Sequence, residues 1–247
     1  MSSKEALVFL HGVGGNGSVW EFQKEAFSDV YDVVGWDAPG YGGRDLIAPF
    51  TIDSLAEQLA LDLAEAGHES CHLVGHSFGG MIAQALAKNH PNKLISLVLS
   101  GTSPAFGSPD GDFQKKFLDA RLKPLDEGKT LADLAPGIVP TLVADNPDPR
   151  GIEIAIASMS SCPSETYRAS MKAIVQFDMR YDLQAISVPT LVLAGEKDTN
   201  APAPMMEKMA AKIPGAKYTV LPSAGHLSNL EQPDAFNAVL KDFLEAL

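Results

Sequence analysis

The amino-acid sequence predicts an α/β fold, with a mostly parallel sheet of about six strands and helices on both faces. Short apolar runs that suit buried strands alternate with amphipathic segments that suit helices, the order expected of parallel strands joined by crossover helices. With 247 residues, 45% of them hydrophobic and 20% charged, the chain is long enough to bury a full core. The expected strands cover residues 6–10, 32–36, 71–75, 94–99, 190–194 and 217–221.

Two helices are marked most clearly. Between the second and third strands, apolar side chains recur at the 3.6-residue period over residues 52–66, with Thr51 as N-cap and Gly67 at the end. Residues 236–247 carry a second apolar stripe, and Pro233 stands near its start, where a missing N–H costs least. Each stripe predicts a helix that packs one face against the sheet.

The alternation fails between residues 103 and 187, which are helical in character and punctuated by proline. Because ligands enter open α/β sheets at the carboxyl ends of the strands, we interpret this stretch as a helical cap, or lid, over that edge. A structural excursion without a role in binding is the alternative. We expect a core domain of residues 1–102 and 188–247 and a cap of residues 103–187, with helices over 112–122, 150–159 and 164–177.

The composition disfavours several classes of partner. A formal net charge of −12 repels both nucleic acid and anionic membranes. Cys71 and Cys162 stand in no Cys-x-x-Cys or Cys/His metal spacing, so we expect no metal and no cofactor. The apolar run at residues 6–10 is too short for a signal sequence or a membrane span, which predicts a cytoplasmic protein.

The segment Gly75-His76-Ser77-Phe78-Gly79 matches Gly-x-Ser-x-Gly, the pattern of a serine held in a sharp turn between a strand and a helix. The flanking glycines leave space where side chains would collide at this crossing. An apolar run precedes the motif at residues 71–74, and helix formers follow it at residues 81–87. The pattern predicts that Ser77 is a nucleophile, and a glycine-flanked turn serine is the alternative.

A serine nucleophile needs a base to take its proton and a carboxylate to orient that base. His226 follows the last expected strand, in a loop before the final helix, and Asp198 follows the strand before it, with Glu196 as its nearest rival. His76 stands beside the serine and is expected to point elsewhere. The chain order Ser77, Asp198, His226 is typical of hydrolases with this strand-turn-helix serine.

Negative charge that develops on the substrate oxygen also needs stabilisation. The loop His11-Gly12-Val13-Gly14-Gly15, directly after the first strand, can turn backbone N–H groups towards Ser77. We assign the oxyanion hole to the backbone N–H groups of Val13 and Phe78. Glycine-rich turns also bind phosphate, but this loop lacks the Gly-Lys-Ser/Thr and dinucleotide patterns.

Five segments, taken in order, are Leu10-His11-Gly12-Val13-Gly14-Gly15-Asn16, Trp36-Asp37-Ala38-Pro39-Gly40-Tyr41-Gly42, Gly75-His76-Ser77-Phe78-Gly79-Gly80-Met81, Gly195-Glu196-Lys197-Asp198 and Gly225-His226. They resemble the landmarks of the α/β-hydrolase superfamily over nearly the whole chain. Within it, the pattern is most similar to capped esterases and lactonases near 3-oxoadipate enol-lactonase. The resemblance implies that Asp37 holds a loop near the site, and a plain turn role is the alternative.

Two departures from that family pattern stand out. Relatives commonly carry two strands before the oxyanion loop, but only ten residues precede His11. We therefore expect no leading hairpin and an exposed edge at the strand over residues 32–36, which leaves monomer and homodimer open. Arg44-Asp45 stands where relatives more often place a small serine.

A serine suits acyl transfer, whereas haloalkane dehalogenases and epoxide hydrolases of similar fold use a carboxylate nucleophile. We predict a carboxylic ester hydrolase that cleaves a small-molecule ester or lactone through an acyl-enzyme intermediate. Hydrolytic C–C cleavage and perhydrolysis use much the same residues and stay open. A non-catalytic ligand-binding protein on this fold is a further alternative.

Substrate choice is expected to depend on the pocket wall and the cap. Four of the five arginines lie in the predicted cap, and one that faces the pocket could bind a substrate carboxylate, with surface ion pairing as the alternative for each. Aromatic and methionine side chains in helices more often belong to the core. The candidate wall residues are His11, Gly12, Trp20, Phe113, Phe117, Arg121, Met159 and Phe177.

Overall fold

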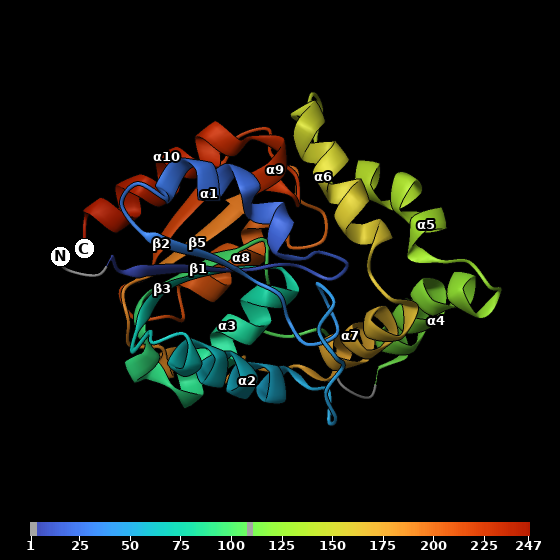
Figure 1. Cartoon of the computed structure of the whole chain (residues 1–247), viewed down its shortest axis with the longest axis horizontal. Coiled ribbons are helices and arrows are strands. Elements are labelled where there is room, and N and C mark those ends of the chain that lie inside the picture. The colour runs from blue at the N-terminus through green and yellow to red at the C-terminus, as the bar shows by residue number, and fades with distance from the viewer. Residues whose placement is uncertain (1–3, 108–110) are drawn as a thin grey trace.

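The computed structural model describes residues 4–107 and 111–247, with a six-stranded sheet at its centre (Figure 1). The strands lie in the order β2-β1-β3-β4-β5-β6, and all neighbouring strands pair in parallel. The predicted parallel sheet is confirmed, and each strand ends within one residue of its expected bound. The strands are β1 (Ala6–Leu10), β2 (Asp32–Trp36), β3 (Cys71–His76), β4 (Leu94–Ser100), β5 (Thr190–Gly195) and β6 (Lys217–Leu221).

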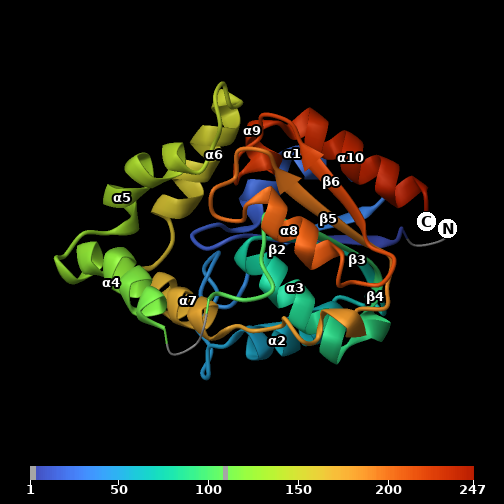
Figure 2. The same cartoon turned by 180° about the vertical axis from the view of Figure 1, so that it is seen from behind.

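Helices cover both faces of the sheet, as predicted. The two views place α1 (Glu21–Phe27) and α10 (Pro233–Glu245) on one face and α2 (Ile52–Glu65) and α3 (Phe78–Asn89) on the other (Figures 1 and 2). Helix α8 (Ala203–Ala210) packs against β5 and β6, and the short α9 (Ser228–Glu231) precedes α10. None of the helices in the described residues is both long and apolar enough to cross a membrane.

Four helices lie between β4 and β5, where the alternation of strands and helices fails. They are α4 (Asp112–Asp126), α5 (Leu131–Ile138), α6 (Pro149–Ser160) and α7 (Ser164–Gln176). They gather beside one end of the sheet, away from the layers formed by the other helices (Figure 2). Helix α5 was not predicted, because its eight residues include Pro136 and are too few to show an apolar period.

The central strands β1 and β3 lie side by side, so the loops that follow them start next to each other. Every residue of β1 and β3 is buried, whereas β2 forms an edge, as expected, and is only partly covered. Leu10 and Gly75, near the ends of β1 and β3, are paired in register. Because the strands are parallel, the loops that follow them all meet at this carboxyl edge.

Candidate active site

Ser77 stands directly after β3, in the turn into α3, and its backbone is strained. Its φ of 52° and ψ of −114° lie where residues other than glycine are rarely found, at a cost of about 1–3 kcal/mol. A Cβ on Gly75 would lie 2.6 Å from the carbonyl oxygen of Gly79, and a Cβ on Gly79 would collide with the carbonyl of Leu10. The flanking glycines therefore permit the sharp turn that the motif predicts.

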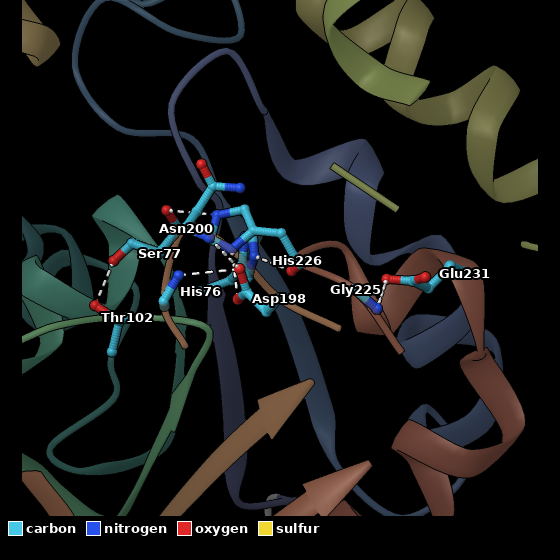
Figure 3. Close-up of polar contacts among 9 residues, drawn as sticks. His76, Ser77, Thr102, Asp198, Asn200, Gly225, His226 and Glu231 are labelled. Atoms are coloured by element: carbon cyan, nitrogen blue, oxygen red, sulfur yellow. Dashed lines mark hydrogen bonds and ion pairs between the residues drawn. The ribbon is translucent and has the colours of Figure 1, made fainter. Parts of the chain in front are cut away.

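Hydrogen bonds hold Ser77 in this conformation. Its N–H donates to the carbonyl oxygen of Ser100 at 3.0 Å. Its own carbonyl oxygen accepts from the N–H groups of Gly80 (3.0 Å) and Met81 (3.2 Å) and from the hydroxyl of Thr102 (2.7 Å) (Figure 3). Thr102, two residues beyond the end of β4, was not predicted, because the loop after β4 was searched only for an acid.

His226 lies between Ser77 and Asp198 (Figure 3). Its Nε2 is 3.1 Å from the Ser77 Oγ, and its Nδ1 is 2.8 Å from the Asp198 Oδ2. Because a carboxylate only accepts hydrogen bonds, Nδ1 carries the proton and Nε2 can accept from the serine hydroxyl. The structure brings together the three residues selected from the sequence, whereas the carboxylate of Glu196 accepts from the N–H of Ser223.

The carboxylate of Asp198 is shielded from solvent, with its side chain 0% exposed. Burial alone would raise the pKa of Asp198, but the hydrogen bond from His226 and the charge of that imidazole outweigh it. Backbone N–H groups of Asn200 (2.7 Å) and Ala201 (2.9 Å) donate to the other oxygen. The pKa of Asp198 therefore lies below its ordinary value of 3.8, and the ionised carboxylate can stabilise a protonated His226.

The backbone of His226 is fixed on both sides. Its N–H donates to the carbonyl oxygen of Leu142 at 2.7 Å, and its carbonyl oxygen accepts from Nε2–H of His76 at 2.8 Å. Burial, reinforced by the charge of His226, lowers the pKa of His76 to about 3, so His76 is neutral. We expected His76 to point away from the serine site. In the structure it lines the pocket, and its ring centroid lies 4.8 Å from that of His226.

Glu231 connects the loop that carries His226 to the segment between α5 and α6. One carboxylate oxygen accepts from the N–H of Gly225 at 2.7 Å (Figure 3), and the other accepts from the N–H of Ala144 at 2.8 Å. Glycine is needed at position 225, because a Cβ there would lie 2.8 Å from the Ala144 nitrogen. Burial raises the pKa of Glu231, and the two donated hydrogen bonds oppose the rise. Glu231 was not predicted from the sequence.

The loop after β1 lies beside Ser77, and Gly12 and Val13 line the same pocket. Neither the N–H of Val13 nor that of Phe78, the first residue of α3, donates to another described residue. Predicted to bind substrate, His11 is instead 1% exposed and lies outside the pocket wall. Its Nδ1–H donates to the carbonyl oxygen of Gly12 at 2.8 Å, so His11 orients this loop from behind.

Asp37 connects loops behind the site. Its Oδ1 accepts from the N–H of Gly17 at 2.7 Å, which agrees with the loop-holding role implied by the resemblance. The unusual Arg44 donates to the carbonyl oxygen of Asp37 at 2.7 Å and pairs with Asp62 on α2 at 2.6 Å. Arg44 thus ties the loop after β2 to α2.

A cavity of about 180 Å³ opens at Ser77, between the carboxyl edge of the sheet and helices α4–α7. Sites for drug-sized ligands usually span about 300–1,000 Å³, so this volume suits a small molecule. Each of the four helices contributes to the wall. The predicted wall residues Gly12, Phe117, Arg121 and Met159 line the cavity.

Three other predicted wall residues do not reach the cavity. Trp20 is 1% exposed, and its indole packs in the core against rings from β1 and α10. Phe113, at the start of α4, is 61% exposed and stacks on Phe106, which itself lines the cavity. Phe177, just after α7, is buried in the core. The positions of aromatic residues in the sequence do not show whether a ring lies in the core, at the surface or in the cavity wall.

The charged groups around the cavity are few. Arg121 is the only Lys, Arg, Asp or Glu among the described residues that line it. Each of the other four arginines is paired with a carboxylate within 2.8 Å. This is the surface ion pairing that the sequence analysis gave as the alternative to substrate binding. Within residues 4–107 and 111–247, no group of three or more His, Cys, Asp or Glu side chains is placed to hold a metal ion.

Comparison with known proteins identifies the family. The model of the alpha/beta hydrolase family matches residues 7–239. The chain belongs to this family. It is 29% identical to the provisionally named carbamate hydrolase RutD of Caulobacter sp. (strain K31), over 98% of this chain and 91% of that protein.

Two further relatives are similar over about nine tenths of their length. 3-Oxoadipate enol-lactonase 1 of Acinetobacter baylyi is 29% identical, over 98% of this chain and 89% of the relative. The structure of a thermophilic esterase from Thermogutta terrifontis superposes with a TM-score of 0.87 at 28% identity, over 99% of this chain and 90% of that one. These proteins support a hydrolase that acts on ester-like or lactone-like substrates.

Proposed function

We propose that the protein is a serine hydrolase that cleaves a small carboxylic ester or lactone through an acyl-enzyme intermediate. The observation that carries this proposal is the hydrogen-bonded chain from Ser77 through His226 to Asp198, which opens into the cavity. Relatives named as an enol-lactonase and an esterase support this substrate class. The relative named as a carbamate hydrolase adds a second candidate, because a carbamate also presents an acyl carbon to a nucleophile.

In the proposed reaction, the Ser77 Oγ attacks the acyl carbon while its proton passes to Nε2 of His226. Asp198 stabilises the imidazolium, and the N–H groups of Val13 and Phe78 donate to the oxyanion. His226 then gives the proton to the leaving oxygen. A water, deprotonated by the same imidazole, attacks the acyl-enzyme and releases the acid.

We further propose that residues 103–187 act as a cap that selects the substrate. Wall residues of α4–α7 face the cavity opposite Ser77. In this segment, the carbonyl of Leu142 accepts from the N–H of His226, and the N–H of Ala144 donates to Glu231, whose other oxygen holds Gly225. The same segment would therefore shape the pocket and support the base.

The proposal is tested by comparing the wild-type protein with Ser77→Ala on p-nitrophenyl acetate and butyrate, unsubstituted lactones and an aryl carbamate. We expect ester or lactone turnover by the wild type and a kcat lower by roughly 10⁴- to 10⁶-fold in the variant. Ser28→Ala, which changes an exposed serine just after α1 and away from the cavity, is the matched control and keeps its activity. Ester hydrolysis that survives in Ser77→Ala would refute the mechanism. C–C cleavage or perhydrolysis without esterase activity would favour those alternatives, and binding without any turnover would favour a receptor.

A further inference from the structure

The cavity at Ser77 combines an apolar wall with one positive charge, although the whole chain carries a net charge of −12. We propose that Arg121, together with the hydroxyl of Tyr167, forms a carboxylate-binding site, and that the preferred substrate is an ester or lactone with a free carboxylate. This inference rests on the proposed function and specifies its substrate class.

The first argument is the contrast between Arg121 and the other arginines. Arg150, Arg168 and Arg180, which also lie between β4 and β5, each contact a carboxylate at 2.8 Å or closer. No carboxylate among the described residues lies within 4.0 Å of Arg121, and its side chain is only partly exposed. In an acidic protein, an arginine that faces a cavity without an acidic partner is available for an anionic ligand.

The second argument is the local geometry. The Arg121 guanidinium lies 5.3 Å from the centroid of the Phe117 ring, and both residues, on α4, line the cavity. Stacking on an aromatic face restricts the guanidinium and leaves its N–H edge available for a planar carboxylate. Tyr167, on α7 and 3% exposed, lines the cavity as well. Both side chains therefore face the same cavity, and the positive charge of Arg121 opposes the rise that burial causes in the pKa of the Tyr167 hydroxyl.

The third argument is energetic. A cation beside an apolar wall loses part of its hydration, and an anionic ligand compensates by charge-assisted, two-point hydrogen bonding. A neutral carboxamide offers a single, uncharged acceptor oxygen, so it cannot make the two-point, charge-assisted contact with the guanidinium. Because charge-assisted hydrogen bonds of this kind contribute more than neutral ones, we expect the site to change affinity by roughly tenfold to a hundredfold.

The test compares p-nitrophenyl half-esters of glutaric, adipic and pimelic acids with the same esters whose far end is a carboxamide. Acetyl esters of short hydroxy acids and of their amides place the carboxylate on the alcohol side. In wild type, kcat/KM should favour a carboxylate over its matched amide in at least one set. Arg121→Gln should lower kcat/KM for that carboxylate by roughly tenfold to a hundredfold and leave the amide within about twofold.

Two further variants sharpen the result. Arg121→Lys keeps the charge without the planar fork and should recover only part of the preference. Arg168→Gln removes a cap arginine that is already paired with Asp126, and it should leave both substrates unchanged. Equal loss on carboxylate and amide in Arg121→Gln would indicate a structural role only and overturn the proposal.

A binding experiment separates this inference from the proposed function. Calorimetry measures the affinity of glutarate, adipate and pimelate for Ser77→Ala and for Ser77→Ala with Arg121→Gln. Tighter binding to the protein that keeps Arg121 supports the site even if no ester is hydrolysed. Equal or undetectable binding to both, with no carboxylate preference in the kinetics, overturns it, while neutral-ester hydrolysis through Ser77 would leave the proposed function intact.

Discussion

Replacing Glu231 with glutamine should both destabilise the protein and slow catalysis. The Glu231 carboxylate accepts from Gly225 and Ala144 at 2.7 and 2.8 Å, whereas a glutamine side chain has only one acceptor oxygen. One buried N–H would then face an NH₂ group, at a cost of about 1–3 kcal/mol. For a chain of this length, that corresponds to a Tm lower by roughly 2–12 °C.

The pH dependence of stability provides a second readout of Glu231→Gln. Because burial raises the folded-state pKa of Glu231 above its ordinary value of 4.5, the folded protein holds this proton more tightly than the unfolded chain does. Wild-type stability attributable to this group therefore falls as the pH rises from 4.5 through the raised pKa. Glutamine does not titrate, so the stability advantage of the wild type over the variant should shrink across that pH window.

Asp198 affects stability with the opposite sign, because its folded-state pKa is lowered. Its contribution to stability is present above pH 3.8 and is lost as the pH falls through the folded-state pKa.

Thermal unfolding followed by circular dichroism, and kcat for p-nitrophenyl acetate, measure these effects. We expect kcat to fall because Gly225 directly precedes His226 and the loop loses a fixed contact. Glu196→Gln is the matched control, because that carboxylate is about half exposed and accepts from a loop N–H, and it should change both quantities little. The reasoning is refuted if Glu231→Gln unfolds at the wild-type temperature and retains the wild-type kcat.

Two further predictions concern the serine turn and the pocket wall. Thr102→Val removes the hydroxyl that donates to the Ser77 carbonyl and should cost about 1–2 kcal/mol of stability and lower kcat, whereas Thr102→Ser keeps the donor and should retain both in unfolding and kinetic assays. Phe117→Ala, which enlarges the cavity, should lower kcat/KM for short acyl esters, while Phe113→Ser, whose exposed ring contacts the wall only through Phe106, should lower it much less. Loss of activity in Phe113→Ser alone would contradict the placement of these two rings.

The fold could be predicted from the sequence because its signals are local. Apolar runs of about six residues marked every strand, and the 3.6-residue period marked α2 and α10. The sequence did not predict α5 or α8. Each has only eight residues, which is too short to show the 3.6-residue apolar period, and each contains a proline. Strand order is a tertiary property, and the edge position of β2 followed only from the family resemblance.

The residues that meet at Ser77 could be selected because each lies in the loop after a strand, and parallel strands bring such loops together. Residues that support the site from a distance could not be selected from the sequence. Glu231 acts through the backbone of Gly225 and Ala144, which are separated from each other by 81 residues, and nothing local indicates that contact. The wall was predicted only in part, because whether an aromatic ring faces cavity, core or solvent depends on how α4–α7 pack.

Labelling with a fluorophosphonate probe, followed by intact-mass measurement and peptide mapping, tests the central claim most directly. A serine activated by His226 and Asp198 should take one probe per chain, at Ser77, with loss of ester hydrolysis in proportion to labelling. His226→Ala, with Ser77 intact, should label far more slowly. The account is contradicted if the protein hydrolyses esters while Ser77 stays unlabelled, or if the probe attaches to another residue with the same loss of activity.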